Sequence, residues 1–319
     1  MSGIIFVPTK NARNRFISYG RYLSLFDYFI ENHNFKYSEE LQCDPLSIEE
    51  DTVIIFKAPE YHSPDLLQDM YKLPSSKNLI GYFTDIHTDS LLTGSYTDDD
   101  KIYIENMTKI LERCDIILCP YRSPFLKLWP QFINKFILFP QFSNYWSDNI
   151  NNTSINKILL SGNIGDWYPL RLLISDSKLD TTIKLIHPGY DLLDYQINPR
   201  YCSVGLDYFN TLLTYAGGIA TGGIMNYITA KHFEIPAVGS LLLAPQLPDL
   251  KELGFLDGIN YISIDKSNFK ERIEDVTYNP EDYLEIRKAG HTHILSHFCL
   301  PHRIKQLESI LELYHAKTK

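Results

Sequence analysis

Short apolar segments of strand length alternate along the chain with longer segments whose apolar residues recur at helical spacing. Residues 53–56 form a fully apolar run, whereas residues 15–31 place Leu23, Phe26 and Phe29 three positions apart. Continuous apolar strands separated by helices are typical of a parallel sheet that is covered on both faces. The pattern therefore predicts an α/β protein with doubly wound sheets.

This alternation occurs twice, on either side of a polar segment. Residues 144–156 are rich in Asn and Ser and have no apolar period, which predicts a linker. We expect an N-terminal domain over 1–145, a linker over 146–156, a C-terminal domain over 157–300 and a final helix over 301–319. The strands that we expect are 3–7, 53–56, 79–83, 115–119 and 135–139 in the first domain, and 157–161, 183–187, 240–244 and 260–264 in the second.

Composition excludes several classes of protein. Of the 319 residues, 44% are hydrophobic and 22% are charged, which is typical of a globular protein. The net charge of -9 argues against binding to a nucleic-acid backbone, which requires a basic face. The longest apolar runs are far shorter than the roughly 20 residues of a membrane span, so we expect no transmembrane segment. The five cysteines are scattered, and the first residues do not resemble a signal peptide; we therefore expect a cytoplasmic protein with reduced thiols.

A glycine-rich segment precedes a predicted helix that ends near Glu234. Gly217, Gly218, Gly222 and Gly223 predict a flexible loop that runs into this helix. Free N–H groups at a helix N-terminus bind phosphate, although a tight turn or a close-packed crossing would equally require glycines.

Glu234 is a second candidate for binding a ligand. Because Pro236 should end the helix, the Glu234 carboxylate is expected near the C-terminal end, where the helix dipole disfavours it. Such a carboxylate accepts two hydrogen bonds and so matches the paired hydroxyls of a ribose. A solvated surface glutamate is the alternative.

Three segments together resemble a known family of enzymes. They are KILLSGNIGDWYPLR at 157–171, KHFEIPAVGSLLLAPQLPDLKELGFLDGINYISID at 231–265, and a tail from 279 to 311 that includes His297, His302 and Arg303. They resemble the donor domain of the "group 1" GT-B glycosyltransferases, of the spore-maturation type. The resemblance covers about residues 157–310.

The resemblance implies a GT-B fold, in which two Rossmann-like domains face a central cleft and the last helix crosses back to the first domain. It also implies transfer of a sugar from a nucleotide-diphosphate donor, most often UDP- or GDP-linked, to a hydroxyl of a glycan or related acceptor, without a metal or other cofactor. A non-catalytic nucleotide- or glycan-binding protein and a nucleotide-sugar epimerase are the alternatives.

The family's donor site maps onto particular positions. Glu234 would hold the ribose, while Lys231 and Arg171 would neutralise the diphosphate. A second Glu of many retaining relatives is replaced here by Asn226, which leaves open whether the sugar contact is an amide or the reaction is not retaining. The remaining positions that the resemblance assigns to the donor are Gly162, Asn163, Gly222 and Gly223 around the phosphates, and His187 and Tyr190 around the base.

An inverting enzyme would need a catalytic base, and the first domain offers two candidates. The sequence TDIHTDS at 84–90 follows a predicted strand and offers Asp85 and His87 as bases for the acceptor hydroxyl. A retaining enzyme needs no such base, and the same residues also suit a helix cap. Lys57 and Glu60 follow another strand and are candidates for acceptor contacts.

Two acidic or histidine clusters have simpler interpretations than metal binding. Asp98, Asp99 and Asp100 precede a predicted helix, so we expect them to form a solvated N-terminal cap. His291, His293 and His297 have the spacing of metal ligands, but the family resemblance places them on one of the closing helices of the donor domain. We therefore expect no metal site.

Overall fold

The computed structural model describes residues 3–7, 20–38, 52–57, 78–84, 86–87, 97–150, 155–180, 182–185 and 205–318. They divide into two compact units. The first contains the described residues up to Pro140, apart from 20 and 21, together with 308–318. The second contains 20, 21 and the described residues from 141 to 307. Each unit has its own parallel sheet, as the alternating pattern predicted.

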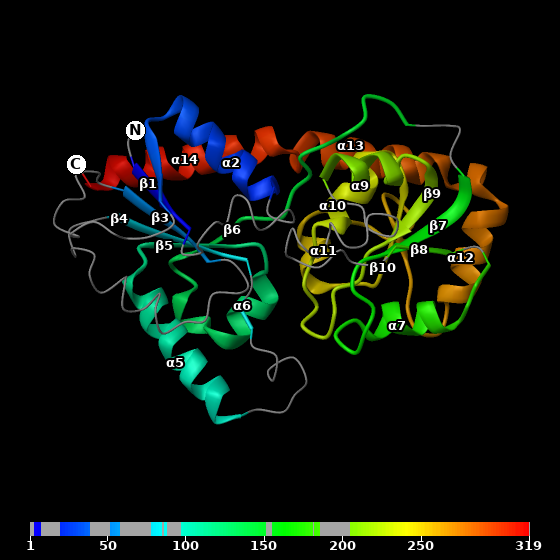
Figure 1. Cartoon of the computed structure of the whole chain (residues 1–319), viewed down its shortest axis with the longest axis horizontal. Helices are drawn as coiled ribbons and strands as arrows, with labels where there is room; N and C mark the ends of the chain where they lie inside the picture. Colours follow the sequence, from blue (N-terminus) through cyan, green and yellow to red (C-terminus); the bar gives the residue numbers. More distant parts are fainter. Residues whose placement is uncertain are drawn as a thin grey trace. The chain divides into compact units, whose positions relative to one another are not determined.

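The sheet of the first unit has six strands in the order β2-β1-β3-β4-β5-β6, and every neighbouring pair is parallel (Figure 1). The pattern did not predict β2, whose sequence FKYS is short and partly polar. The strands are β1 (Gly3–Phe6), β2 (Phe35–Ser38), β3 (Thr52–Lys57), β4 (Asn78–Phe83), β5 (Ile116–Cys119) and β6 (Phe136–Leu138). The helices are α2 (Gly20–Asn32), α5 (Asp98–Arg113) and α6 (Arg122–Leu128).

Aromatic rings form the contact between α2 and this sheet. Tyr22 and Phe26 of α2 lie 4.9 and 5.2 Å from the Phe56 ring of β3, and Tyr82 of β4 packs edge-on to the same ring. Edge-to-face rings at these separations are favoured by the charge distribution of aromatic systems. The apolar stripe of the helix is thereby fixed on the sheet.

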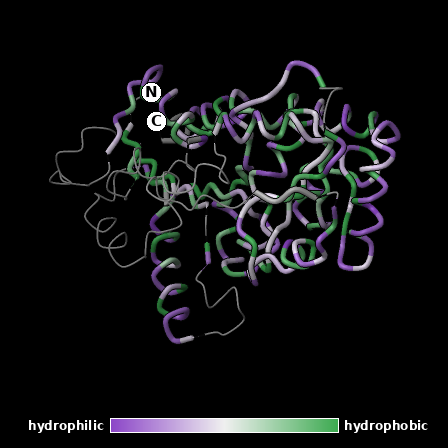
Figure 2. The backbone as a smooth tube through the Cα atoms, turned by 45° about the vertical axis from the view of Figure 1, so that its right-hand side comes forward, coloured by the Kyte–Doolittle hydropathy of each residue, from purple (hydrophilic) through white to green (hydrophobic). Residues whose placement is uncertain are grey.

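The acidic residues at 98–100 form the first turn of α5, which therefore begins earlier than predicted; Asp98 and Asp99 are exposed, as expected, but Asp100 is buried. Thr97 is the N-cap, and its backbone N–H donates to the Asp100 carboxylate while its hydroxyl accepts from the Asp100 N–H. This reciprocal arrangement is a capping box, and it begins the helix at Asp98, before the apolar period starts. The first turn is strongly hydrophilic (Figure 2).

The sheet of the second unit has five parallel strands in the order β11-β10-β9-β7-β8. The strands are β7 (Ile155–Ser161), β8 (Thr182–Leu185), β9 (Tyr215–Ile219), β10 (Leu241–Ala244) and β11 (Ile262–Ser263). The helices are α7 (Pro169–Asp176), α9 (Gly205–Leu212), α10 (Lys231–Ala237), α11 (Pro248–Glu252), α12 (Phe269–Tyr278) and α13 (Leu284–His297). Helix α14 (Leu300–Thr318) begins in this unit, and its residues from 308 onward belong to the first unit.

Alternate residues of β10 point to opposite faces of this sheet. Leu241 and Leu243 join the core beneath α7 and α12, whereas Leu242 and Ala244 join the core beneath α9, α10 and α13 (Figure 1). Both faces are therefore dry, which explains why the strand is apolar at every position. No helix of the described residues is long and apolar enough to cross a membrane.

The expected flexible loop at Gly217 and Gly218 is wrong. Both glycines lie inside β9, where they pair in register with Leu241 and Leu242 of β10. A Cβ at Gly217 would lie 2.9 Å from the Leu241 carbonyl oxygen, and one at Gly218 would lie 3.0 Å from the Ile235 side chain. Glycine occurs at these positions because Gly217 packs against the backbone of β10 and Gly218 packs against a side chain of α10, not because the segment is mobile.

Replacement of Gly217 by alanine tests this packing. We expect Gly217→Ala to destabilise the second unit by about 1–3 kcal/mol because the new methyl group meets rigid backbone. Gly165→Ala is the matched control, since a Cβ there meets nothing within 4 Å. Hydrogen exchange of the β9 and β10 amides measures the local loss of stability; equal protection in both variants would contradict the assignment.

Candidate functional site

The turn after β7 brings two positive side chains onto one glycine. Gly162 is buried and has a φ of +98°, a conformation that favours glycine. A Cβ on Gly162 would lie 3.0 Å from both the Arg171 Nη1 and the Lys231 Nζ. The two cationic nitrogens are therefore close neighbours, and they can take these positions only because residue 162 is a glycine and has no side chain.

Arg171 is held in place from two sides. Its guanidinium is 4.0 Å from the centre of the Tyr168 ring, and its Nη1 donates a 2.7 Å hydrogen bond to the Asn163 carbonyl oxygen. Only 3% of Arg171 is exposed, although it carries a full charge. Asn163 thus orients the arginine through its backbone, while its own side chain is exposed.

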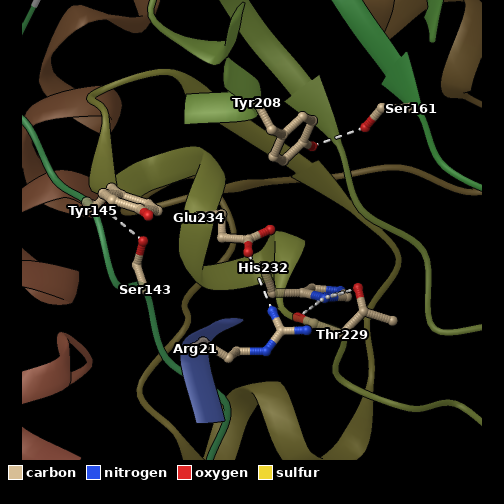
Figure 3. Close-up of polar contacts among 8 residues, drawn as sticks. All are labelled: Arg21, Ser143, Tyr145, Ser161, Tyr208, Thr229, His232 and Glu234. Atoms are coloured by element: carbon tan, nitrogen blue, oxygen red, sulfur yellow. Dashed lines mark hydrogen bonds and ion pairs between the residues drawn. The ribbon is translucent and has the colours of Figure 1, made fainter. Parts of the chain in front are cut away.

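Lys231 is the first residue of α10 and lies beside an aromatic ring. Its Nζ is 5.7 Å from the centre of the Tyr208 ring, and the Tyr208 hydroxyl hydrogen-bonds the Ser161 Oγ at 2.8 Å (Figure 3). Burial and, to a smaller extent, the charges of Arg171 and Arg21 lower the pKa of Lys231 to about 8, although the charge of Glu234 acts in the opposite direction. The negative charge of Glu234 therefore does not offset the burial of Lys231 and its repulsion by the neighbouring arginines.

Glu234 lies one helical turn after Lys231 and faces an arginine. Arg21 Nη1, from the start of α2, donates to Glu234 Oε1 at 3.2 Å (Figure 3). The side chains of Arg21 and Glu234 are 20% and 26% exposed, so a ligand can reach them. Glu234 was predicted as a site residue, but no sequence signal pointed to Arg21, which lies more than 200 residues earlier in the chain.

The expected position of Glu234 near a helix C-terminus is wrong. Helix α10 begins at Lys231 and continues to Ala237 with Pro236 inside it, and the Glu234 N–H donates to the Ala230 carbonyl. The carboxylate is in the first helical turn, where the helix dipole stabilises negative charge. The helix dipole therefore does not disfavour the Glu234 carboxylate, and an unfavourable position cannot be used as evidence that Glu234 is functional.

Gly222, Gly223 and Asn226 form a turn packed on the loop before α7. Gly223 has a φ of +62°, and a Cβ there would lie 2.8 Å from the Trp167 carbonyl oxygen, which also accepts from the Ile224 N–H. Asn226 has a φ of +57° and an exposed side chain. Gly222 and Gly223 are thus held tightly, and the turn presents Asn226 to solvent.

His232 is a buried residue of the same helix that the sequence did not single out. Its Nδ1 donates to the Thr229 carbonyl oxygen at 3.1 Å, and among the described residues its Nε2 has no hydrogen-bond partner (Figure 3). Burial lowers the pKa of His232 to about 3. The ring is therefore neutral and adds no charge to the neighbouring cations.

Several predicted site residues cannot be placed. Asp85, His187, Tyr190 and Glu60 lie outside the described residues, as does the side chain of Lys57. His87 follows β4 in the first unit and is half-buried.

The histidines of α13 make contacts of their own. His291 Nε2 donates to the Ser147 carbonyl at 2.9 Å, and His293 Nε2 donates to the Leu253 carbonyl at the same distance. Within the described ranges, no group of three or more His, Cys, Asp or Glu side chains is arranged to hold a metal ion.

The chemistry of the second unit's site is that of an anion receptor. Arg171, Lys231 and Arg21 contribute three positive charges, while the Glu234 carboxylate pairs with Arg21 and interacts electrostatically with Lys231. Closely spaced cations in a partly buried site repel one another, and a multiply charged anion relieves this repulsion.

Comparison with known proteins gives one family match. Residues 215–309 match a family described as glycosyl transferase-like. This segment includes Lys231 and Glu234. No curated protein sequence matches the chain significantly.

Solved structures extend the likeness to nearly the whole chain. An alpha-glucosyltransferase in complex with UDP-glucose and DNA containing an abasic site has a TM-score of 0.62 and 12% identity, and the match covers 98% of this chain and 99% of that chain. Sucrose-phosphate synthase from Thermosynechococcus elongatus has a TM-score of 0.63 and 10% identity, with 99% and 100% covered. The pneumococcal O-GlcNAc transferase GtfA, in complex with UDP and GlcNAc, has a TM-score of 0.52 and 12% identity, with 82% and 56% covered.

These comparisons confirm the predicted fold class. The chain has the GT-B fold of two parallel-sheet units, and it is glycosyltransferase-like over the C-terminal part of the second unit. The roles of the individual site residues stay predictions.

The lowered pKa of Lys231 makes stability depend on pH. Between about pH 8 and 10.5 the unfolded chain holds a proton on Lys231 that the folded chain has lost, so the free energy of unfolding rises with pH in this window. Urea unfolding at pH 8 and pH 10 should show wild type gaining stability relative to Lys231→Met. Lys270→Met, at an exposed position of α12, is the control. An identical pH response in wild type and Lys231→Met would contradict the assignment.

Proposed function

We propose that the chain is a glycosyltransferase that moves a sugar from a nucleoside-diphosphate sugar to a hydroxyl of a glycan or related acceptor. The observation that carries the proposal is the convergence of Arg171 and Lys231 on Gly162, with Glu234 one helical turn away. The GT-B fold and the glycosyl transferase-like match support it.

The two cations suit the diphosphate of such a donor. Arg171 and Lys231 converge on backbone that has no side chain at Gly162, so a phosphate group can approach all three at once. In glycosyl transfer the bond between the sugar and the diphosphate breaks, and negative charge develops on the departing phosphate oxygen. Fixed positive charges stabilise this charge, which is the task that a metal ion performs in other enzymes. We therefore propose transfer without a metal.

Glu234 suits the ribose of the same donor. Positions three apart on a helix are separated by roughly 5–6 Å between Cβ atoms, so Glu234 and Lys231 reach adjacent parts of one nucleotide. The carboxylate accepts hydrogen bonds from both ribose hydroxyls. Because it is one-quarter exposed, it does not have to leave a core to do so.

The donor and acceptor are partly indicated by the solved relatives. The alpha-glucosyltransferase and GtfA structures contain UDP or UDP-glucose, so uridine nucleotides are the first donors to test, followed by guanosine nucleotides. The alpha-glucosyltransferase was also solved with DNA. For this chain the net charge of -9 favours an acceptor other than nucleic acid.

Two further elements belong to the proposal. Asp85 and His87 are our candidates for the base that deprotonates the acceptor hydroxyl if the reaction is inverting. We place the reaction in the cytoplasm, which is supported by Cys114, Cys119 and Cys299, three buried cysteines of the described residues that form no disulfide.

Removal of the Glu234 carboxylate tests the donor site. Calorimetric titration with UDP and GDP should show one of them binding to wild type. We expect Glu234→Ala to weaken its affinity roughly ten-fold or more, because hydrogen bonds to a charged group are worth about 1.5–3 kcal/mol. Glu271→Ala, on an exposed position of α12, should bind like wild type. Failure of both nucleotides to bind wild type would refute the proposal.

The pH dependence of nucleotide affinity tests the role of Lys231. A diphosphate binds the protonated lysine, whose pKa in the free protein is about 8. We therefore expect the UDP or GDP affinity to fall roughly ten-fold between pH 8 and pH 9.5. Lys231→Arg, whose side chain stays charged, should give a flat profile. A wild-type profile that is also flat would exclude Lys231 from the phosphate site.

A protein that binds nucleotide without transferring sugar is a second candidate. It is favoured by Asn226, which stands where the resemblance expects a glutamate and whose side chain is exposed on its turn. Release of nucleoside diphosphate from a panel of nucleotide sugars separates the two candidates, since only a transferase or hydrolase releases it catalytically.

A further inference from the structure

The carboxylate assigned to the ribose already has a partner. Arg21 Nη1 donates to Glu234 Oε1 at 3.2 Å, and both side chains are partly exposed (Figure 3). A ribose that hydrogen-bonds Glu234 must share this carboxylate with Arg21 or displace it. The fate of Arg21 on nucleotide binding is therefore a question that the geometry raises directly.

Arg21 also lies within reach of the phosphate site. It contacts Glu234, which is one helical turn from Lys231, and its charge acts on Lys231 along with that of Arg171. Arg21 is thus a third cation beside the two that converge on Gly162, where a diphosphate is expected. Arg21 enters this group from the first residues of α2, while Arg171 and Lys231 come from α7 and α10.

A diphosphate is a stronger partner for Arg21 than Glu234 is. It carries two to three negative charges against one on the carboxylate, and a guanidinium binds phosphate oxygens through two parallel hydrogen bonds. The side chains of the existing ion pair are 20% and 26% exposed, and ion pairs that water reaches contribute little to stability. The exchange of partners is therefore favourable when a diphosphate is present.

We propose that Arg21 transfers its ion pair from Glu234 to the donor diphosphate when nucleotide binds, which frees Glu234 for the ribose hydroxyls. This inference rests on the proposed function. It makes Arg21 a specificity-determining residue: a nucleoside without phosphates must share Glu234 with Arg21 or displace it, and it offers Arg21 no phosphate in exchange. The site therefore selects nucleoside diphosphates against nucleosides by more than the phosphate contacts of Arg171 and Lys231 alone.

The test compares two ligands that differ only in the diphosphate. Affinities for UDP and uridine, or for GDP and guanosine if GDP is the nucleotide that binds, are measured in wild type and Arg21→Gln. We use calorimetry for the nucleotide and ligand-observed NMR for the nucleoside. Thermal unfolding shows whether each variant is folded. Arg272→Gln, on an exposed position of α12, is the matched control, and Arg21→Lys is a second variant that keeps the charge.

The two ligands should respond in opposite directions. In Arg21→Gln we expect UDP to bind roughly ten-fold more weakly, because a charged phosphate contact is lost. We expect uridine to bind up to about five-fold more tightly, because Glu234 is no longer occupied. Arg21→Lys should keep most of the wild-type preference for UDP, and Arg272→Gln should keep all of it.

Other outcomes overturn the inference in distinguishable ways. Equal weakening of UDP and uridine would mean that Arg21 only positions Glu234. No change in either affinity, together with loss of UDP binding in Glu234→Ala, would remove Arg21 from the site and leave the proposed function standing. If neither UDP nor GDP binds wild type, the proposed function fails and this inference fails with it.

Discussion

The donor site depends on the space that Gly162 leaves open. Arg171 Nη1 and Lys231 Nζ both lie 3.0 Å from the point where a side chain would begin, so any larger residue would push at least one of them away. Two like charges approach this closely only if the surrounding structure holds them, here through the Asn163 carbonyl and the Tyr168 ring around Arg171. Burial, together with the charge of Arg171, lowers the pKa of Lys231. An anion with several charges would relieve the repulsion between these like charges, and this requirement links the local geometry to the proposed reaction.

The parallel sheet brings these groups together from distant parts of the chain. Strands β7 and β9 are neighbours, so the turn that contains Gly162 and the segment that follows β9 meet at the same edge. Both faces of the sheet are covered by helices, and the apolar strands leave this edge as the place where polar side chains gather. Helix α7 supplies Arg171 and helix α10 supplies Lys231 and Glu234, each near its beginning.

The sequence was informative where one residue type or one period determines the outcome. The alternation of apolar strands and amphipathic helices predicted both sheets, and the resemblance identified Arg171, Lys231 and Gly162, which the structure brings together. It failed where tertiary packing overrides local rules. Gly217 and Gly218 suggested a mobile loop, yet they are buried strand residues. Because they have no side chain, the Leu241 carbonyl and the Ile235 side chain can pack closely against them. The helix does end close to Pro236, at Ala237, but it begins only at Lys231, so Glu234 lies in its first turn. Arg21 and His232 carried no local signal, because their significance arises only from contacts made after folding.

A crystal structure of the protein with UDP or GDP tests the central claim most directly. The account predicts that the diphosphate lies against the Gly162 backbone within hydrogen-bonding distance of Arg171 and Lys231, with the ribose hydroxyls on Glu234. A nucleotide bound elsewhere on the chain, or one whose phosphates point away from Gly162, would contradict the account.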